Sequence, residues 1–578
     1  MSPRRALSTA LAALALLVAP AARADPLPPI IENAARVLPV LARRGMVVAQ
    51  ERRAAQIGVD VLKGGGNAVD AAVAVGFALA VTLPRAGNLG GGGFMLVHLA
   101  ATGEDVALDY RETAPAAADA RMFLDARGEA DPQLSRGGGL SVGVPGTVAG
   151  LGLALARWGS GRFTLAQLLA PALRLARDGV AIEDDLADSL PRAAPRLARW
   201  PEARRVFLDP EGRAPPQGAI LRQPDLAGTL ERIARDGPDG FYGGETAERI
   251  AATVQAAGGR MTREDLRAYA AQIRAPLRGT YRGHAVVSMP PPSSGGAHLI
   301  ELLNVLERFP LRDWGAGSAA TVHVMAEAMK LAFADRAAWM GDPAFTTMPI
   351  KGLLSKDYAA RLAERVSLDR ATPAADVSRV DPAPFEGDQT THFSVVDAAG
   401  NAVSNTTTLN FSYGSGIVAE GTGVLLNNEL DDFAAKPGAR NAFGLTGGAA
   451  NAPGPNKRPL SSMTPTFVFT DGGLEIVTGS PGGPRIITTV LQQILNILDF
   501  GMNAAEAMDA VRVHHQWTPD ELRMERGASP DTVAALRAKG QNVRVGDAMG
   551  SVATIHLRDG VIMGASDTRQ RGTAAVGY

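Results

Sequence analysis

From residue 391 onward the chain carries its clearest local pattern, that of two consecutive β-strands. Phe393 and Val395 take every second place in the first run. A short turn at 398–401 follows, and then a threonine-rich run over residues 402–410. Aromatic and β-branched residues bounded by turn residues favour strands. The sequence therefore predicts a β-hairpin here, and the fold must place its two strands side by side.

Two hydroxyl side chains, Thr390 and Thr391, stand at the start of this hairpin. A pair of threonines at a strand edge commonly has no chemical role. A threonine hydroxyl becomes a good nucleophile only beside a base, and a free α-amine on the same residue can be that base. Thr390 gains such an amine only if the Gln389–Thr390 bond is cut. The residues alone leave both interpretations open.

Composition narrows the class of protein. The 578 residues are 46% apolar and 20% charged, which are values typical of globular proteins. A net charge of −1 argues against a nucleic-acid partner, because phosphate neutralisation needs a basic excess. There is no cysteine, which excludes thiol catalysis and cysteine-bound metals. The adjacent His514 and His515 have no third ligand nearby, so we expect no metal site.

The N-terminus resembles a secretory signal. Arg4 and Arg5 precede an apolar run at 6–19, and Ala22-Arg23-Ala24 fits a cleavage site. The apolar run is too short to span a bilayer, and no later stretch is long and apolar enough. We therefore expect a cut after Ala24 and a periplasmic or secreted product with no membrane span.

Helical patterns dominate the first two thirds of the chain. Residues 51–83 predict a helix, a glycine break and a buried second helix with Asn67 as its cap. Residues 150–275 are mainly helical in pattern, although Pro171 is expected to kink one helix. A further buried helix is predicted at 486–498. This alternation of helices and strands indicates an α/β layered fold.

Five further segments carry polar or glycine-rich motifs: 87–96, 108–115, 425–433, 454–465 and 478–486. Each has an ordinary explanation when taken alone. A glycine run is usually a turn, a lone arginine at a strand end is usually solvated, and the adjacent Asp431 and Asp432 suit a solvated acidic turn. The motifs gain meaning from their order along the chain.

Together with the run Thr390-Thr391-His392-Phe393-Ser394-Val395-Val396-Asp397, these motifs resemble those of the γ-glutamyltransferases (γ-glutamyl transpeptidases) over nearly the whole mature chain. These enzymes are self-cleaving N-terminal-nucleophile hydrolases. The resemblance implies a four-layer αββα sandwich and no cofactor. It also implies a signal peptide at 1–24, a large subunit at 25–389 and a small subunit at 390–578, the two subunits forming one domain as a heterodimer.

The resemblance also assigns catalytic roles. It makes Thr390 the nucleophile, Thr408 the residue that holds it, and the amides of Gly482 and Gly483 the oxyanion hole. Backbone amides in a glycine turn suit a developing oxyanion because they are fixed before reaction begins. This chain departs from the family at Pro484, where serine or alanine is frequent.

The substrate-binding residues that the resemblance implies are Arg111 for the α-carboxylate, Asp432 with Glu429 for the α-ammonium, Asn410, and the serine pair Ser461 and Ser462. A rigid two-pronged guanidinium is well suited to a carboxylate. A lid is implied at 436–448. Phe443 occupies a lid position where well-known bacterial members carry tyrosine, and it can shield the pocket but cannot donate a hydrogen bond.

The expected activity is that of an exported γ-glutamyltransferase and glutathione hydrolase, a zymogen that cuts itself at Gln389–Thr390. The enzyme would pass the γ-glutamyl group of glutathione to water or to amino acid and peptide acceptors. Two alternatives stay open. One is a related β-lactam acylase of the glutaryl type, and the other is a non-catalytic exported binding protein.

Overall fold

The predicted hairpin lies at the centre of a seven-stranded antiparallel sheet. Strand β10 (Thr391–Val396) pairs with β11 (Ala402–Thr408), with Thr391 opposite Thr407. On its other edge β10 pairs with β2 (Met46–Ala49), and β11 pairs with β3 (Gly92–Leu99). Strands with two neighbours have their backbone groups fixed on both sides, so the end of the hairpin is held rigidly.

This computed structural model describes residues 35–377, 391–436, 445 and 447–578. Residues 37–578 form one compact unit, and the account below concerns that unit.

The described residues form two large sheets and two small ones. The first large sheet has the order β19-β2-β10-β11-β3-β4-β7, and the second has the order β1-β18-β17-β13-β12-β9-β8. The other strands of the first sheet are β4 (Glu104–Tyr110), β7 (Gln272–Arg274) and β19 (Ala574–Gly577). The second sheet comprises β1 (Val40–Ala42), β8 (Leu277–Tyr281), β9 (His284–Ser288), β12 (Thr466–Thr470), β13 (Gly473–Thr478), β17 (Ala553–Arg558) and β18 (Val561–Ser566). The small sheets contain β14 (Val513–His514), β15 (Leu522–Glu525) and β16 (Val543–Gly546), and β5 (Val180–Ala181) and β6 (Ile220–Leu221).

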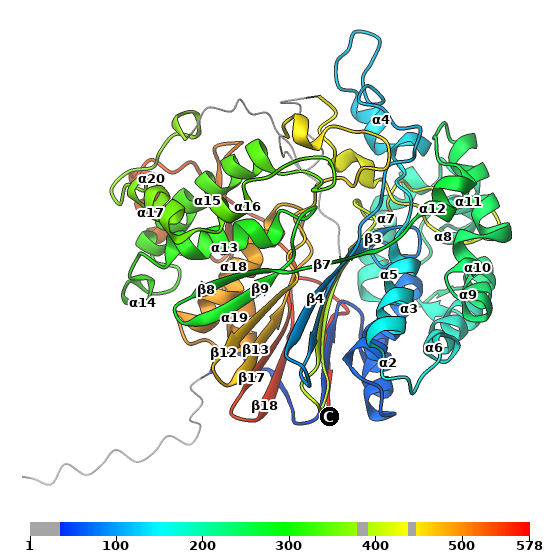
Figure 1. Cartoon of the computed structure of the whole chain (residues 1–578), viewed down its shortest axis with the longest axis horizontal. Coiled ribbons are helices and arrows are strands. Elements are labelled where there is room, and N and C mark those ends of the chain that lie inside the picture. The colour runs from blue at the N-terminus through cyan, green and yellow to red at the C-terminus, as the bar shows by residue number, and fades with distance from the viewer. Residues whose placement is uncertain (1–34, 378–390, 437–444, 446) are drawn as a thin grey trace, which may run out of the picture. The chain divides into compact units, whose positions relative to one another are not determined.

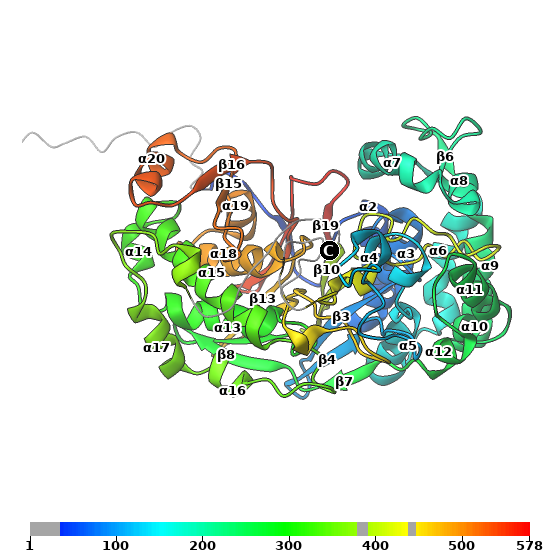
Figure 2. The same ribbon diagram turned by 90° about the horizontal axis from the view of Figure 1, so that it is seen from above.

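The two large sheets pack face to face between two layers of helices (Figures 1 and 2). Strand β10 contacts β13 and β17 across the interface, and β2 contacts β18. Helices α2 (Arg52–Lys63), α3 (Ala68–Thr82) and α5 (Thr147–Trp158) cover the first sheet. Helices α13 (Gly295–Leu306) and α19 (Ala504–Asp509) lie against the second sheet, with α15 (Ala319–Trp339) and α18 (Arg485–Leu498) packed on α13. The predicted four-layer αββα sandwich is confirmed.

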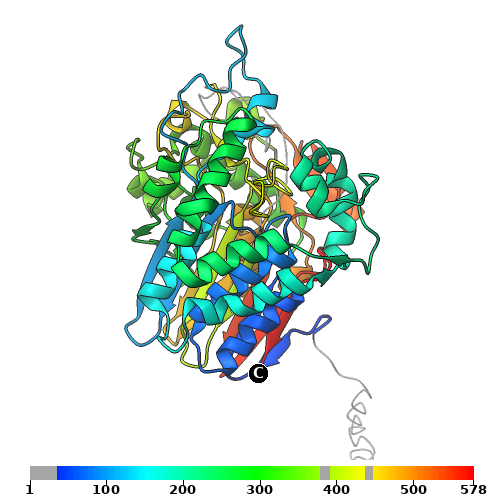
Figure 3. The ribbon, with the colours of Figure 1, turned by 90° about the vertical axis from the view of Figure 1, so that its right-hand side faces the viewer.

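Further helices extend the two outer layers. On the outer side of the first sheet, α6 (Leu165–Asp178) packs on α3, and α9 (Pro224–Asp236), α10 (Asp239–Tyr242) and α11 (Gly244–Ala256) follow it (Figure 3). Helices α7 (Asp184–Leu197) and α8 (Pro201–Phe207) pack on each other and stand to one side of this layer (Figure 2). The remaining helices are α4 (Pro132–Arg136), α12 (Arg263–Ala268), α14 (Leu311–Trp314), α16 (Ile350–Leu353), α17 (Lys356–Glu364) and α20 (Pro530–Ala538).

Local signals explain several of these helices. Asn67 caps α3 through a capping box with Asp70, and every residue of α3 is buried, as predicted. Helix α6 runs through Pro171 without ending. A capping box at Thr164 and the buried Leu168 and Leu169 anchor its first turns, which compensates for the missing amide.

Both large sheets combine strands from before and after residue 390. In the first sheet β2 lies between β19 and β10, and in the second sheet β9 pairs with β12. None of the helices within the described ranges has the length and apolar character needed to cross a membrane.

Candidate active site

The open end of the hairpin is formed by Thr391 and Thr408. Thr408 is the last residue of β11 and lies opposite Gly92 of β3. Its Oγ1 accepts a hydrogen bond of 2.7 Å from the amide of Asn410. Thr390 precedes Thr391 in sequence, and it lies outside the described residues.

Asn410 turns the chain away from the sheet immediately after this hydroxyl. Its φ of 72° is in the left-handed region, which asparagine tolerates better than most residues. Its Nδ2 donates to the carbonyl of Asn428 at 2.9 Å. Its Oδ1 is buried and accepts no hydrogen bond within the described part of the chain. A buried acceptor of this kind is available to a ligand.

His392 is the imidazole nearest to this end in sequence, and its surroundings keep it neutral. Its Nδ1 lies 2.8 Å from Thr406 Oγ1, and its Nε2 lies 3.2 Å from Ser394 Oγ. Burial lowers its pKa to about 3. Gly479 packs so closely that an added Cβ would lie 2.2 Å from the ring. His392 is therefore a packed core side chain with no exposed nitrogen for proton transfer.

A glycine turn between β13 and α18 offers two backbone amides. Gly482 and Gly483 have φ values of 131° and 54°, and their carbonyls accept from the amides of Arg485 and Ile486 at 3.1 and 3.2 Å. Among the described residues, neither glycine amide has an acceptor. Pro484 is the N-cap of α18. The N–H groups at the start of a helix have no partner within the helix, so the N–H that proline lacks is not missed there. The amides and the positive end of α18 suit a negatively charged oxygen.

Arg111 lies completely buried at the end of β4 among carboxylates. Its Nη1 donates to Glu429, and its Nη2 lies 2.6 Å from Asp432 Oδ2. Its Nε donates to the carbonyl of Pro459 at 3.1 Å. Glu112 lies 3.8 Å away, and neither of its oxygens has a hydrogen-bond partner among the described residues. The guanidinium is thus fixed in place with three carboxylates around it.

Burial makes these carboxylates unusually basic. It raises the pKa of Glu112 to about 7 and that of Asp432 to about 6, although Arg111 opposes both shifts. Burial also raises the pKa of Glu429 well above its ordinary value. The buried Glu112 and Glu429 and the partly buried Asp432 share one guanidinium, so a second cation held between them would favour their charged forms.

A second buried arginine holds Ser462 of the serine pair, and the sequence analysis did not identify it. Arg336 of α15 donates to Ser462 Oγ at 3.0 Å and to Ser294 Oγ at 2.8 Å. Ser461 Oγ accepts from the amide of Met463 at 3.1 Å. Burial lowers the pKa of Arg336 to about 10. Its position in the long, largely buried helix α15 is the signal that could have drawn attention to it, because a buried charge needs partners.

A cavity of about 20 Å³ joins these side chains, enough for roughly one water molecule. Its lining comprises Arg111, Arg336, Thr408, Asn410, Glu429, Asp432, Leu445, Ser461, Ser462, Met463, Gly483, Pro484 and Ile486.

The model of one protein family, described as Gamma-glutamyltranspeptidase, matches residues 54–577. The chain belongs to this family. Its similarity to curated gamma-glutamyltranspeptidase relatives is extensive. It is 51% identical to the glutathione hydrolase proenzyme of Escherichia coli (strain K12), covering 96% of each chain. It is 44% identical to the glutathione hydrolase proenzyme of Pseudomonas sp. (strain A14), covering 94% of this chain and 96% of that one.

Among solved structures, the cephalosporin acylase from Bacillus halodurans is similar with a TM-score of 0.82 and 29% identity. The match covers 96% of this chain and 99% of that one. The αββα sandwich is therefore shared between the gamma-glutamyltranspeptidase family and an acylase, and the side chains of the site must decide between the two chemistries.

Most of the residues expected in a gamma-glutamyltranspeptidase site meet at the small cavity. These are Arg111, Thr408, Asn410, Glu429, Asp432, Ser461, Ser462 and Gly483, with Gly482 adjacent. Thr390 and Phe443 lie outside the described residues, so the nucleophile and the lid residue stay predictions. Glu112 and Arg336 join the cluster without having been predicted there. Within the described ranges, no group of three or more His, Asp or Glu side chains is arranged to hold a metal ion.

Proposed function

We propose that the chain is an exported γ-glutamyltransferase with glutathione hydrolase activity, made as a precursor that cuts itself at Gln389–Thr390. The observation that carries this proposal is the cluster of Arg111 with Asp432 and Glu429 at a cavity that Gly483 also lines. A cation and carboxylates at fixed positions match the charged end of a free amino acid, and we expect its γ-carbonyl to meet the glycine amides.

In the first reaction, self-cleavage, the Thr390 hydroxyl attacks the Gln389 carbonyl. The bond between Gln389 and the Thr390 nitrogen breaks, an ester to Thr390 Oγ forms, and water then hydrolyses that ester. The products are chains 25–389 and 390–578, and the second begins with a free amine. The proenzyme names of the Escherichia coli and Pseudomonas relatives support this reaction.

Binding of the donor must then open the small cavity. A volume of about 20 Å³ cannot hold a glutamyl group, so the Arg111–Asp432 pair must separate as the donor enters. The donor replaces the internal pair with two external ones. Its α-carboxylate meets Arg111 with Ser461 and Ser462, and its α-ammonium meets Asp432 with Glu429.

In the second reaction the Thr390 hydroxyl attacks the γ-carbonyl of the donor, and the Thr390 amine accepts the hydroxyl proton. The amides of Gly482 and Gly483 stabilise the oxyanion that forms. The amide bond breaks, its nitrogen leaves with the proton, and a γ-glutamyl ester of Thr390 remains. Water or an acceptor amine then attacks this ester and restores the hydroxyl.

Export is the remaining part of the proposal. The pattern of residues 1–24 supports removal of a signal peptide after Ala24. The mature large chain would begin at Asp25, and the N-terminal sequence of the exported protein tests this directly.

The glutaryl-type acylase is the second candidate, and the structural similarity to a cephalosporin acylase favours it. A γ-glutamyl anilide and a glutaryl anilide differ only by the α-ammonium group, so turnover of the two separates the proposals. We expect the γ-glutamyl compound to be favoured about 10- to 150-fold in kcat/KM, the scale of one lost charged hydrogen bond. Equal turnover, or preference for the glutaryl compound, would support the acylase.

A non-catalytic binding protein would turn over neither anilide and would run as one band on a denaturing gel. The proposed enzyme gives two bands.

A further inference from the structure

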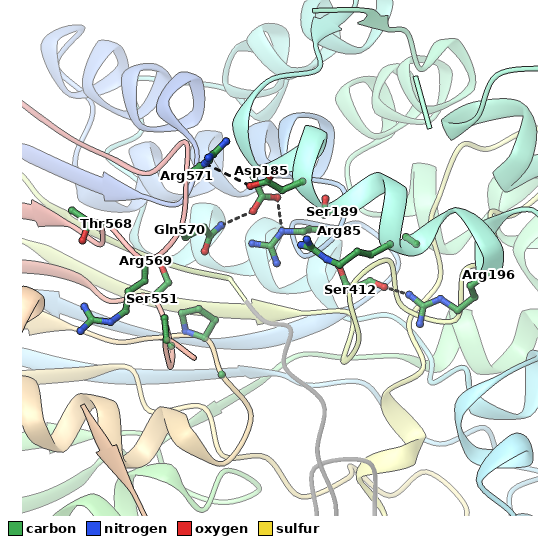
Figure 4. Close-up of a pocket in the computed structure, with 17 residues that line it drawn as sticks. Arg85, Asp185, Ser189, Arg196, Ser412, Ser551, Thr568, Arg569, Gln570 and Arg571 are labelled. Atoms are coloured by element: carbon green, nitrogen blue, oxygen red, sulfur yellow. Dashed lines mark hydrogen bonds and ion pairs between the residues drawn. The ribbon is translucent and has the colours of Figure 1, made fainter. Parts of the chain in front are cut away.

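A second and much larger cavity, of about 620 Å³, lies next to the glycine turn (Figure 4). It shares two chain segments with the small cavity. Asn410 and Gly483 line the small cavity, whereas Ser412 and Gly482 line the large one. The two cavities therefore adjoin along the same two segments, and Arg111 lines only the small one.

One face of helix α7 forms a wall of this large cavity. Asp185, Ser189, Arg192 and Arg196 line it at intervals of three or four residues, which places them on one side of the helix. The acidic residues lie in the first turns and the arginines in the last turns. The wall thus has an acidic end and a basic end.

The acidic end is already neutralised. Asp185 pairs with Arg85 and also accepts from Gln570 Nε2 at 3.2 Å (Figure 4). Asp188 lies 3.7 Å from Arg571. On the opposite wall, two carboxylates bind Arg569, namely Glu525 at 2.6 Å and Asp567 at 3.3 Å.

Within the described part of the chain, the basic end has no such carboxylate. Arg192 is exposed and makes no ion pair with any described residue. Arg196 donates to the carbonyl of Ser412, and its Nε is buried with no acceptor in the described part of the chain. A buried guanidinium N–H without a partner is costly unless an anion binds there. Two arginines one turn apart, neither of which pairs with a carboxylate of the described residues, make a site for a carboxylate.

We propose that the large cavity binds the amino acid or peptide that leaves the donor or accepts the γ-glutamyl group. Arg192 and Arg196 hold the α-carboxylate of this molecule. This inference rests on the function proposed above. The amine of that molecule then points towards Gly482, where the γ-glutamyl ester of Thr390 is expected. The ligand class is therefore an amino acid or short peptide with a free C-terminal carboxylate.

The transfer step needs only the acceptor amine, the γ-glutamyl ester and the Thr390 amine. The acceptor amine attacks the ester carbonyl, and a new amide bond forms as the bond to Thr390 Oγ breaks. The proton of the amine passes through the Thr390 amine to the departing oxygen. Arg192 and Arg196 take no part in bond making or breaking, and they act by holding the acceptor in position.

The test compares two acceptors with a γ-glutamyl anilide as donor, because its leaving group carries no carboxylate. Glycylglycine has a C-terminal carboxylate, and glycylglycinamide has a neutral amide in its place. In Arg192→Gln and Arg196→Gln we expect kcat/KM for glycylglycine to fall about 10- to 100-fold, the scale of a charged hydrogen bond. Transfer to glycylglycinamide should change less than about threefold.

Arg199→Gln is the matched control, since Arg199 follows the same helix but does not line the cavity. This variant should leave kcat/KM for both acceptors unchanged. Hydrolysis of the anilide by water reports on the proposed function itself. If this hydrolysis persists while kcat/KM falls equally for both acceptors, or falls for neither, the carboxylate site is wrong and the proposed function stands. If the unmodified protein hydrolyses no anilide, the proposed function fails first.

Discussion

At the scale of single residues, the account depends on how Arg111 is held before any donor binds. It donates to Glu429 and Asp432, and Glu112 stands beside them without a hydrogen-bond partner among the described residues. Buried charges are tolerated when they are paired. A donor with one carboxylate and one ammonium can enter this cluster and give both Arg111 and Asp432 a new partner. A donor without the ammonium leaves Asp432 unpaired once it separates from Arg111.

The first prediction removes the charge of Asp432. Asp432→Asn should lower kcat/KM for a γ-glutamyl anilide by about 10- to 150-fold, because one charged hydrogen bond is lost. Turnover of the glutaryl anilide should stay within about threefold. Steady-state kinetics with the two anilides measures the difference, and an equal loss for both would show that Asp432 does not bind the ammonium.

The second prediction concerns pH. Burial raises the pKa of Asp432 to about 6, so the carboxylate takes up a proton as the pH falls through that value. The raised pKa also means that this group stabilises the fold at low pH and that this contribution is lost as the pH rises through about 6. Ammonium binding needs the charged form. KM for the γ-glutamyl donor should therefore rise about tenfold per pH unit below 6.

Asp432→Asn is the control for this titration. The KM of this variant should be higher than that of the unmodified protein at every pH, and it should not rise steeply below pH 6. A rise of the same slope in the variant would assign the titration to another group.

The sequence could identify these residues only in part. Arg111, Asp432 and the serine pair lie in short motifs that resemble a known family. Arg336 lies in α15, far from those motifs, and reaches Ser462 only because α15 packs beside that segment. Its role depends on tertiary contact, which no local pattern encodes.

At the scale of elements, the turn before α18 is the part most sensitive to a small change. Gly482 has a φ of 131°, a conformation that residues with a Cβ rarely adopt, although an added Cβ would meet nothing closer than 3.5 Å. The strain in Gly482→Ala would therefore come from the backbone and would turn its amide away from the oxyanion.

We predict that Gly482→Ala lowers kcat about 100-fold and changes KM less than about threefold, as for other losses of one oxyanion donor. The comparison uses protein that has already separated into two bands on a denaturing gel. An unchanged kcat in such protein would remove the Gly482 amide from the oxyanion hole.

The elements themselves differ in how far local sequence determines them. Helices α2 and α3 follow from caps and periodicity within about thirty residues, and the predicted break between them is present. The hairpin of β10 and β11 was predicted for the same reason. The placement of β2 and β3 on either side of it could not be predicted, since these strands come from segments hundreds of residues away.

At the scale of the whole molecule, the two sheets explain how a cut chain stays together. Strands from before and after residue 390 are hydrogen-bonded neighbours in both sheets, as β2 with β10 and β9 with β12. Separating the pieces would expose both cores and break these ladders. We predict that the two pieces elute together in native size-exclusion chromatography and separate only in denaturant. Elution of either piece alone under native conditions would contradict the interleaved architecture.

The central claim is that the chain cuts itself before Thr390 and so makes its own nucleophile and base. Intact mass spectrometry with N-terminal sequencing of purified, active protein tests it most directly, with Thr390→Ala run alongside. We predict a small chain that begins at Thr390 in the active protein, and a single uncut chain without activity in the variant. Active protein that is continuous across Gln389–Thr390 would contradict the account.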